Sequence, residues 1–202
     1  MRRAIFGQTV SVFDVERLPA DTGPTQFVRL CGALIGKALA DHIGSSTLPE
    51  ISERINVPDG GVDAEYTTPE ALSLTETGGL IGPGRTVFQF KYRDVSAADQ
   101  KKIFQGIAQK LRKEFPRVAP SCDRYVLLTN LELSGTQGRR LREVLLESYP
   151  AFVNKPIVIR GAAAIVDALN QTPHLRHLFF AQGGLCTLDF AEDELKAAYQ
   201  RI

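Results

Sequence analysis

The chain has 202 residues, the length of one domain or of one domain with a small appendage. The net charge of +1 excludes a surface that is basic throughout, and 44% hydrophobic and 23% charged residues are ordinary values for a globular protein. No apolar stretch reaches the roughly 20 residues of a membrane span, and the N-terminus lacks the pattern of a signal peptide. The three cysteines are far apart and form no CxxC pair, so we expect reduced thiols in a cytoplasmic protein without a membrane partner.

The first half of the chain predicts a helix followed by three strands. Apolar residues at helical spacing predict an amphipathic helix over residues 25–42, with Pro24 at its start. Alternation of apolar and polar residues predicts strands at 51–57 and 62–66, which are joined by a PDGG turn at 58–61. After a loop over 67–82, which overlaps the glycine-rich segment 78–84, aromatic and β-branched residues predict a strand at 86–92.

The second half alternates helices with strands. A pair resembling a capping box, Ser96 and Asp99, predicts a helix that runs to about Phe115. Strands at 124–130 and 156–161 and helices at 136–148, 162–170 and about 174–180 follow. This alternation indicates parallel pairing, whereas the hairpin-like first half indicates antiparallel pairing. We therefore predict an α/β fold with a mixed sheet and helices on both faces.

Period-two geometry places polar side chains on one face of the predicted sheet. Phe88, Phe90 and Tyr92 share one face, and Val87, Gln89 and Lys91 share the other. In the strand at 62–66, Val62, Ala64 and Tyr66 share a face, whereas Asp63 and Glu65 point the other way. Glu53 is an acid on an apolar face, which is costly unless it is paired or bound to a metal.

These side chains form a candidate metal site. Carboxylate and amide oxygens are ligands suited to Mg²⁺ or Mn²⁺, and a neighbouring lysine orients a water or steadies the charge on a phosphate. We expect Asp63, Gln89 and Lys91 to converge with Glu53 or Glu65. This combination suits the hydrolysis of phosphodiester bonds.

The segments GGVDA and VFQFK resemble the PD-(D/E)xK nuclease superfamily, in particular its Mrr-like restriction-endonuclease branch. The resemblance implies that Asp63 and Gln89 hold the metal together with the backbone carbonyl of Phe90, and that Lys91 is catalytic. It also implies a restriction-endonuclease-like three-layer α/β/α fold, with a core of order αβββαβ over about residues 25–130. A βα extension over about 131–190 and a linker helix over about 191–202 would complete a single domain, 1–202.

The C-terminal half, from YVLLTN to HLRHLFF, resembles the nuclease-like domains at the N-terminus of antiviral NTPases of the Avs or STAND type. The two resemblances imply a Mg²⁺-dependent endodeoxyribonuclease that acts on double-stranded DNA as an effector of anti-phage defence. The chain ends in the middle of a predicted helix, AEDELKAAYQRI, so we expect it to continue into a longer protein with an NTPase region. We also expect homo-oligomerisation of that longer protein to activate it.

Two departures from the family pattern motivate an alternative, a catalytically inactive nuclease fold that serves as a DNA-binding or interaction module. The Phe-Glu pair of the first helix reads Phe27-Val28 here, and Gln26 is the nearby polar substitute. Gln89 is neutral, so the metal must draw charge from Glu53 or Glu65. Cleavage of RNA is a third reading.

Each candidate residue also has a structural interpretation. Asp63 is compatible with a plain turn, Lys91 with an edge strand, Glu53 with a salt bridge to Lys91, and Glu65 with a solvated position. The basic residues after the motif suit either a solvated helix face or contacts with the DNA backbone: Lys101, Lys102, Lys110, Arg112 and Lys113. His174 and His177 have no ligand partners at zinc spacing, so we predict no zinc site.

Overall fold

The computed structural model describes residues 9–18, 22–43, 50–51, 62–68, 80–95 and 99–180. The predicted turn at 58–61, Glu53, Ser96, Cys186 and the predicted linker helix at 191–202 lie outside these residues. The helices are α1 (Val12–Glu16), α2 (Gly23–Ile43), α3 (Gln100–Val118), α4 (Gly135–Ser148), α5 (Ala162–Asn170) and α6 (Pro173–Phe180). The strands are β1 (Glu50–Ile51), β2 (Ala64–Thr68), β3 (Gly84–Lys91), β4 (Arg124–Thr129) and β5 (Ile157–Arg160).

The five strands form one mixed sheet in the order β1-β2-β3-β4-β5. β1 and β2, and β2 and β3, pair antiparallel, with Ala64 opposite Phe88 in the second pair. β3 and β4, and β4 and β5, pair parallel, because α3 and α4 provide the crossovers that parallel strands need. β3 therefore lies in the middle of the sheet and has a hydrogen-bonded neighbour on each side.

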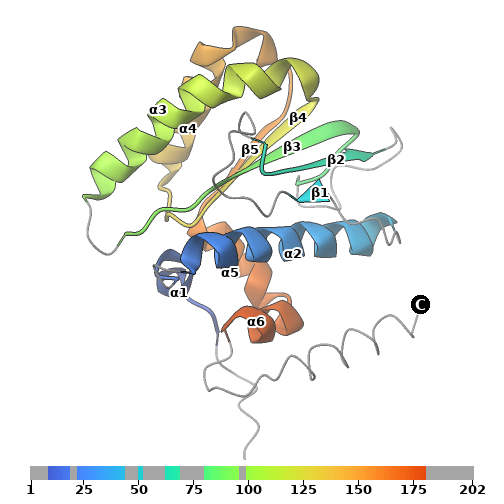
Figure 1. Ribbon diagram of the computed structural model, residues 1–202, viewed down its shortest axis with the longest axis vertical. Coiled ribbons are helices and arrows are strands. Elements are labelled where there is room, and N and C mark those ends of the chain that lie inside the picture. Colours follow the sequence, from blue (N-terminus) through green and yellow to red (C-terminus); the bar gives the residue numbers. More distant parts are fainter. Residues whose placement is uncertain are drawn as a thin grey trace, which may run out of the picture.

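Helices cover both faces of the sheet, so the fold has three layers (Figure 1). One core cluster joins Phe88 and Phe90 of β3 to apolar residues of α1, α2, α5 and α6. The other joins Val87 of β3 and Tyr125 of β4 to apolar residues of α3 and α4. The predicted alternation of β3 is confirmed, because the side chains before and after Gln89 pack on the opposite face from Val87.

The helix boundaries follow from capping and from apolar stripes. The Asp99 side chain accepts a hydrogen bond of 2.9 Å from the Lys101 N–H and starts α3. Ile103, Ile107, Leu111 and Phe115 then bury one face of this helix. Ser134 and Gln137 form a reciprocal capping box that starts α4.

The α/β class, the mixed sheet and the helices on both faces are confirmed. Several details differ from the sequence prediction. α1 was not predicted, Asp99 itself caps α3, α3 ends at Val118 and not at about Phe115, and β2 begins at Ala64 instead of residue 62. The predicted grouping of Val62 with Ala64 and Tyr66 is wrong, because Val62 packs against the α3–α4 cluster. Val62 precedes the first paired residue of β2, so strand alternation does not fix its direction.

Candidate functional site

Asp63 lies in a bend just before β2 and docks onto the backbone of β3. Its N–H donates to the Phe88 carbonyl at 3.0 Å, and its Oδ2 accepts from the Phe90 N–H at 2.6 Å. The carboxylate thus takes the place of a backbone acceptor where the β2–β3 ladder ends. The N–H and C=O of one strand residue face the same neighbour, so the Phe90 carbonyl points to the edge that Asp63 occupies.

Gln89 is fully buried, and both ends of its side-chain amide are bound. The Nε2 donates to Glu114 Oε2 at 2.6 Å, and the Oε1 accepts a hydrogen bond from the Tyr125 hydroxyl. Burial, then the negative charges of Glu114 and Asp63, raise the pKa of Tyr125 well above its ordinary value. Tyr125 therefore remains a hydrogen-bond donor at neutral pH and fixes the orientation of the Gln89 amide.

Lys91, the last residue of β3, forms a nearly buried ion pair. Its Nζ lies 2.8 Å from Glu114 Oε2, and the two side chains are 9% and 22% exposed. The same oxygen accepts the Gln89 hydrogen bond, so one carboxylate binds both polar residues of β3. A buried ammonium without a counter-ion is costly, and Glu114 supplies that counter-ion.

Glu114 was not predicted from the sequence, although a signal for it is present. It lies three residues after Leu111 and four before Val118, which are both buried on the face of α3 that covers the sheet. An acid within such an apolar stripe requires a polar partner beneath it. Lys91, a lysine on the inner face of a buried strand, is the complementary signal.

Two of the other predicted residues lie away from this cluster. Glu65 forms an ion pair with Arg85, toward the start of β3, with both side chains about one-third exposed. Gln26 lies on α2, which covers the opposite face of the sheet from Gln89 and Lys91. Glu53 lies outside the described residues, so the predicted ion pair between Glu53 and Lys91 stays untested.

The predicted basic residues of α3 are all exposed, whereas Glu114 points inward to the sheet. Exposure is compatible with both interpretations of Lys101, Lys102, Lys110, Arg112 and Lys113, a solvated helix face or contacts with a nucleic-acid backbone, so that choice stays open. They do not point into the space that Lys91 and Gln89 occupy.

The chemistry of the polar residues fits a hard divalent cation. Glu114 binds the Gln89 amide, Asp63 binds the backbone N–H of the next residue, and the Phe90 carbonyl faces the Asp63 edge. Oxygen donors of this kind suit Mg²⁺ or Mn²⁺. Within the described ranges, no group of three or more His, Cys, Asp or Glu is placed to hold a metal.

Comparisons with protein-family models, with curated proteins and with solved structures gave no match to this chain. Among the helices described, none combines the length and the hydropathy that crossing a membrane requires.

Proposed function

We propose that the chain is a Mg²⁺- or Mn²⁺-dependent endonuclease domain that hydrolyses phosphodiester bonds in double-stranded DNA. The observation on which this rests is the docking of the Asp63 carboxylate on the backbone N–H of Phe90, the residue between Gln89 and Lys91 in β3. The proposal brings together the family resemblance of these residues and their contacts in the fold.

Within the proposed site, Asp63 and the Phe90 carbonyl would hold the cation, and Gln89 would contribute its amide oxygen once Tyr125 released it. A bound divalent ion lowers the pKa of a water and offsets negative charge on the phosphate. Lys91 would place its ammonium beside the reacting phosphate and stabilise the added charge of the transition state. Glu114 would hold Lys91 in place, because it binds the ammonium and the neighbouring amide together.

A plasmid-nicking assay with Mg²⁺ or Mn²⁺ tests the proposal. Asp63→Asn and Lys91→Ala should each abolish nicking by the activated parent. Asp123→Asn is a matched control, because Asp123 Oδ2 also accepts a backbone N–H of β3, from Arg85 at 3.0 Å. Nicking that survives equally in both site variants would rule out the assignment, and loss in the control variant as well would indicate a folding defect.

A second candidate function is a nuclease-fold module that binds DNA or a partner without cleaving it. It is favoured by the full burial of Gln89 and by the pairing of Lys91 with Glu114, which occupy the groups that catalysis would use. Calorimetry distinguishes the two functions. Binding of DNA without any binding of Mn²⁺ would favour the module, and a panel of DNA and RNA substrates would reveal an RNA-directed activity.

The proposal extends to the biological setting implied by the sequence resemblance. There the domain would act as the nuclease effector of a longer cytoplasmic anti-phage protein with an NTPase region, activated by homo-oligomerisation. The sequence of the full-length gene product tests this part, because it should encode an NTPase region downstream. If no NTPase region follows, the assignment to anti-phage defence is refuted, whereas the nuclease proposal is unaffected.

A further inference from the structure

Charge is distributed unevenly over this nearly neutral chain. α3 and α4 together contain nine Lys and Arg against three Asp and Glu, whereas the rest of the chain contains 15 against 20. One of the three acids is Glu114, which points inward and pairs with Lys91. The outer surface of the α3–α4 layer is therefore strongly basic, although the net charge of the chain is only +1.

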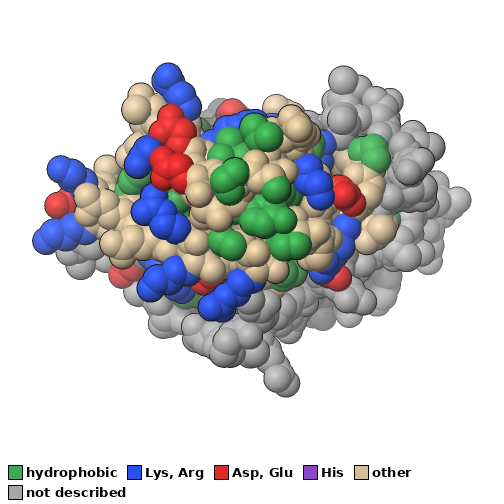
Figure 2. All heavy atoms as spheres, turned by 90° about the horizontal axis from the view of Figure 1, so that it is seen from above, with side chains coloured by type: hydrophobic (Ala, Val, Ile, Leu, Met, Phe, Trp, Pro, Cys, Tyr) green, Lys and Arg blue, Asp and Glu red, His purple; other side chains and the backbone are tan. Residues whose placement is uncertain are grey.

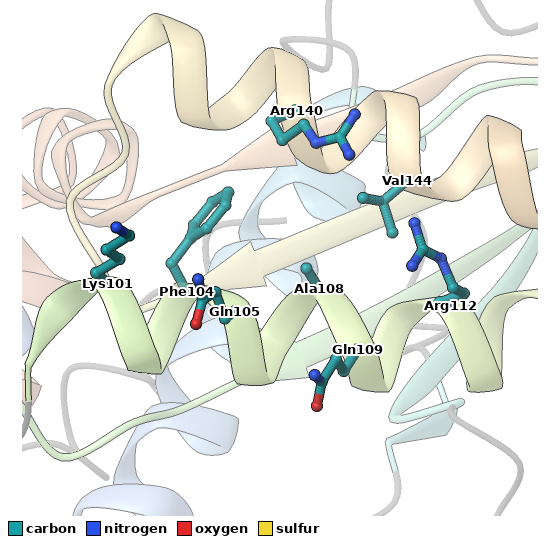
Figure 3. A pocket seen from close by; sticks show the side chains of 8 residues that line it. All are labelled: Lys101, Phe104, Gln105, Ala108, Gln109, Arg112, Arg140 and Val144. Atoms are coloured by element: carbon teal, nitrogen blue, oxygen red, sulfur yellow. The ribbon is translucent and has the colours of Figure 1, made fainter.

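A groove of about 610 Å³ runs between α3 and α4 on this basic surface. Phe104 and Ala108 of α3 and Val144 of α4 supply apolar side chains, and Lys101, Arg112 and Arg140 supply charge. Figure 2 looks onto this layer and shows apolar side chains with Lys and Arg, and some Asp or Glu, around them. In Figure 3 the Phe104 ring points from α3 toward α4. The charged residues that line the groove are cations, two of which pair with Glu147.

One carboxylate holds the two arginines across the groove. Glu147 Oε2 lies 2.8 Å from Arg112 on α3, and Glu147 Oε1 lies 3.2 Å from Arg140 on α4. Arg140 also contacts Glu143 at 3.0 Å. A guanidinium has five N–H donors, so each arginine keeps donors for an anion. Pairing to a common acid orders both side chains in advance, which lowers the entropy cost of binding.

We propose that this groove binds a single strand of nucleic acid, with phosphates on Arg112, Arg140 and Lys101 and a base against Phe104. Proteins that bind single strands combine a positive groove with aromatic rings on which bases stack. An amphipathic acidic helix would need a longer row of apolar anchors than Phe104, Ala108 and Val144 provide. The groove lies on the outer side of α3, away from Glu114 and Asp63, so this inference does not depend on the proposed nuclease activity.

The test measures fluorescence anisotropy of labelled 15-nucleotide oligothymidylate and oligouridylate at several NaCl concentrations. EDTA is present, so cleavage does not contribute and a failure of the nuclease proposal cannot be mistaken for a failure of this one. Tighter binding of oligothymidylate would identify the preferred strand as DNA, and tighter binding of oligouridylate would identify it as RNA. Polyglutamate as a competitor tests for an acidic peptide instead.

The logarithm of the binding constant falls linearly with the logarithm of the NaCl concentration. Arg112→Gln/Arg140→Gln should reduce the magnitude of this slope by about 1.4, because each lost contact to a phosphate of a single strand accounts for about 0.7. If the two proteins bind equally at 1 M salt, this change in slope predicts about 25-fold weaker binding at 0.1 M salt. Phe104→Leu should weaken binding at least about fivefold through lost stacking. The control is Arg17→Gln/Arg29→Gln, which removes two exposed cations from the opposite layer and should change binding far less.

Circular dichroism and thermal melting establish that each variant is folded. The lost ion pairs are about half exposed, so little stability should be lost with them. The proposal is refuted if the folded parent shows no salt-dependent binding to either oligonucleotide. It is equally refuted if the groove variant loses no more affinity than the control, or if only polyglutamate binds.

Discussion

Glu114→Gln tests the buried ion pair at the centre of the candidate site. The substitution keeps the shape of the side chain and an oxygen that can accept from Gln89, but it removes the charge that balances Lys91. Removing one partner of a buried pair costs about 3–5 kcal/mol. Because the Glu114 side chain is 22% exposed, we expect the lower end of that range, about 3 kcal/mol of unfolding free energy. For a chain of this length, that lowers the melting temperature by about 6–12 °C.

The double variant Lys91→Met/Glu114→Gln separates the charge from the packing. It removes both charges and keeps the acceptor for Gln89, so its stability should fall within about 1 kcal/mol of the parent. Glu147→Ala is the control, because its pairs are about half exposed and should contribute about 1 kcal/mol or less. Urea unfolding at pH 7 measures the free energy of unfolding of the parent, of Glu114→Gln, of the double variant and of Glu147→Ala. The reasoning is wrong if Glu114→Gln costs less than about 1 kcal/mol, or if the double variant is no more stable than Glu114→Gln.

Two further predictions concern the other end of β3. Gly84 has φ of 81°, and a Cβ there would meet the Asp123 carboxylate, so Gly84→Ala should cost at least about 1–2 kcal/mol in urea unfolding; an unchanged midpoint would contradict this. Burial raises the pKa of the Cys122 thiol to about 11, so its stabilising contribution is complete below pH 9 and is lost as the pH rises toward 11. The unfolding free energy of the parent should therefore fall more steeply between pH 8 and 10.5 than that of Cys122→Ala. Equal pH dependence of the two proteins would refute the raised pKa of Cys122.

The sequence predicted the faces of β3 because that strand is regular. Hydrogen bonds on both sides constrain the backbone of β3 in the middle of the sheet, so residues two apart share a face as strand geometry requires. The same rule failed at Val62, which lies before the β2 ladder begins. Periodicity predicts side-chain direction only where neighbouring strands constrain the backbone.

The candidate site was predicted only in part, because its acid comes from a distant helix. Asp63, Gln89 and Lys91 were recognised from their strands, but Glu114 lies on α3, 23 residues after Lys91, and was not singled out from the sequence. Its pairing depends on how α3 rotates over the sheet, which Leu111 and Phe115 set by packing. Tyr125 was likewise read as an ordinary residue of a buried strand, because hydrogen bonds between neighbouring strands depend on their register.

The parallel order of β3, β4 and β5 has an electrostatic consequence. Each of these strands is followed by a helix, so the first turns of α3, α4 and α5 gather at the edge of the sheet where Lys91 ends β3. A helix carries about half a positive charge at its N-terminus, from backbone N–H groups that substitutions other than proline leave in place. The parallel chain direction therefore adds partial positive charge at that edge, and replacing Lys91 would leave this contribution in place.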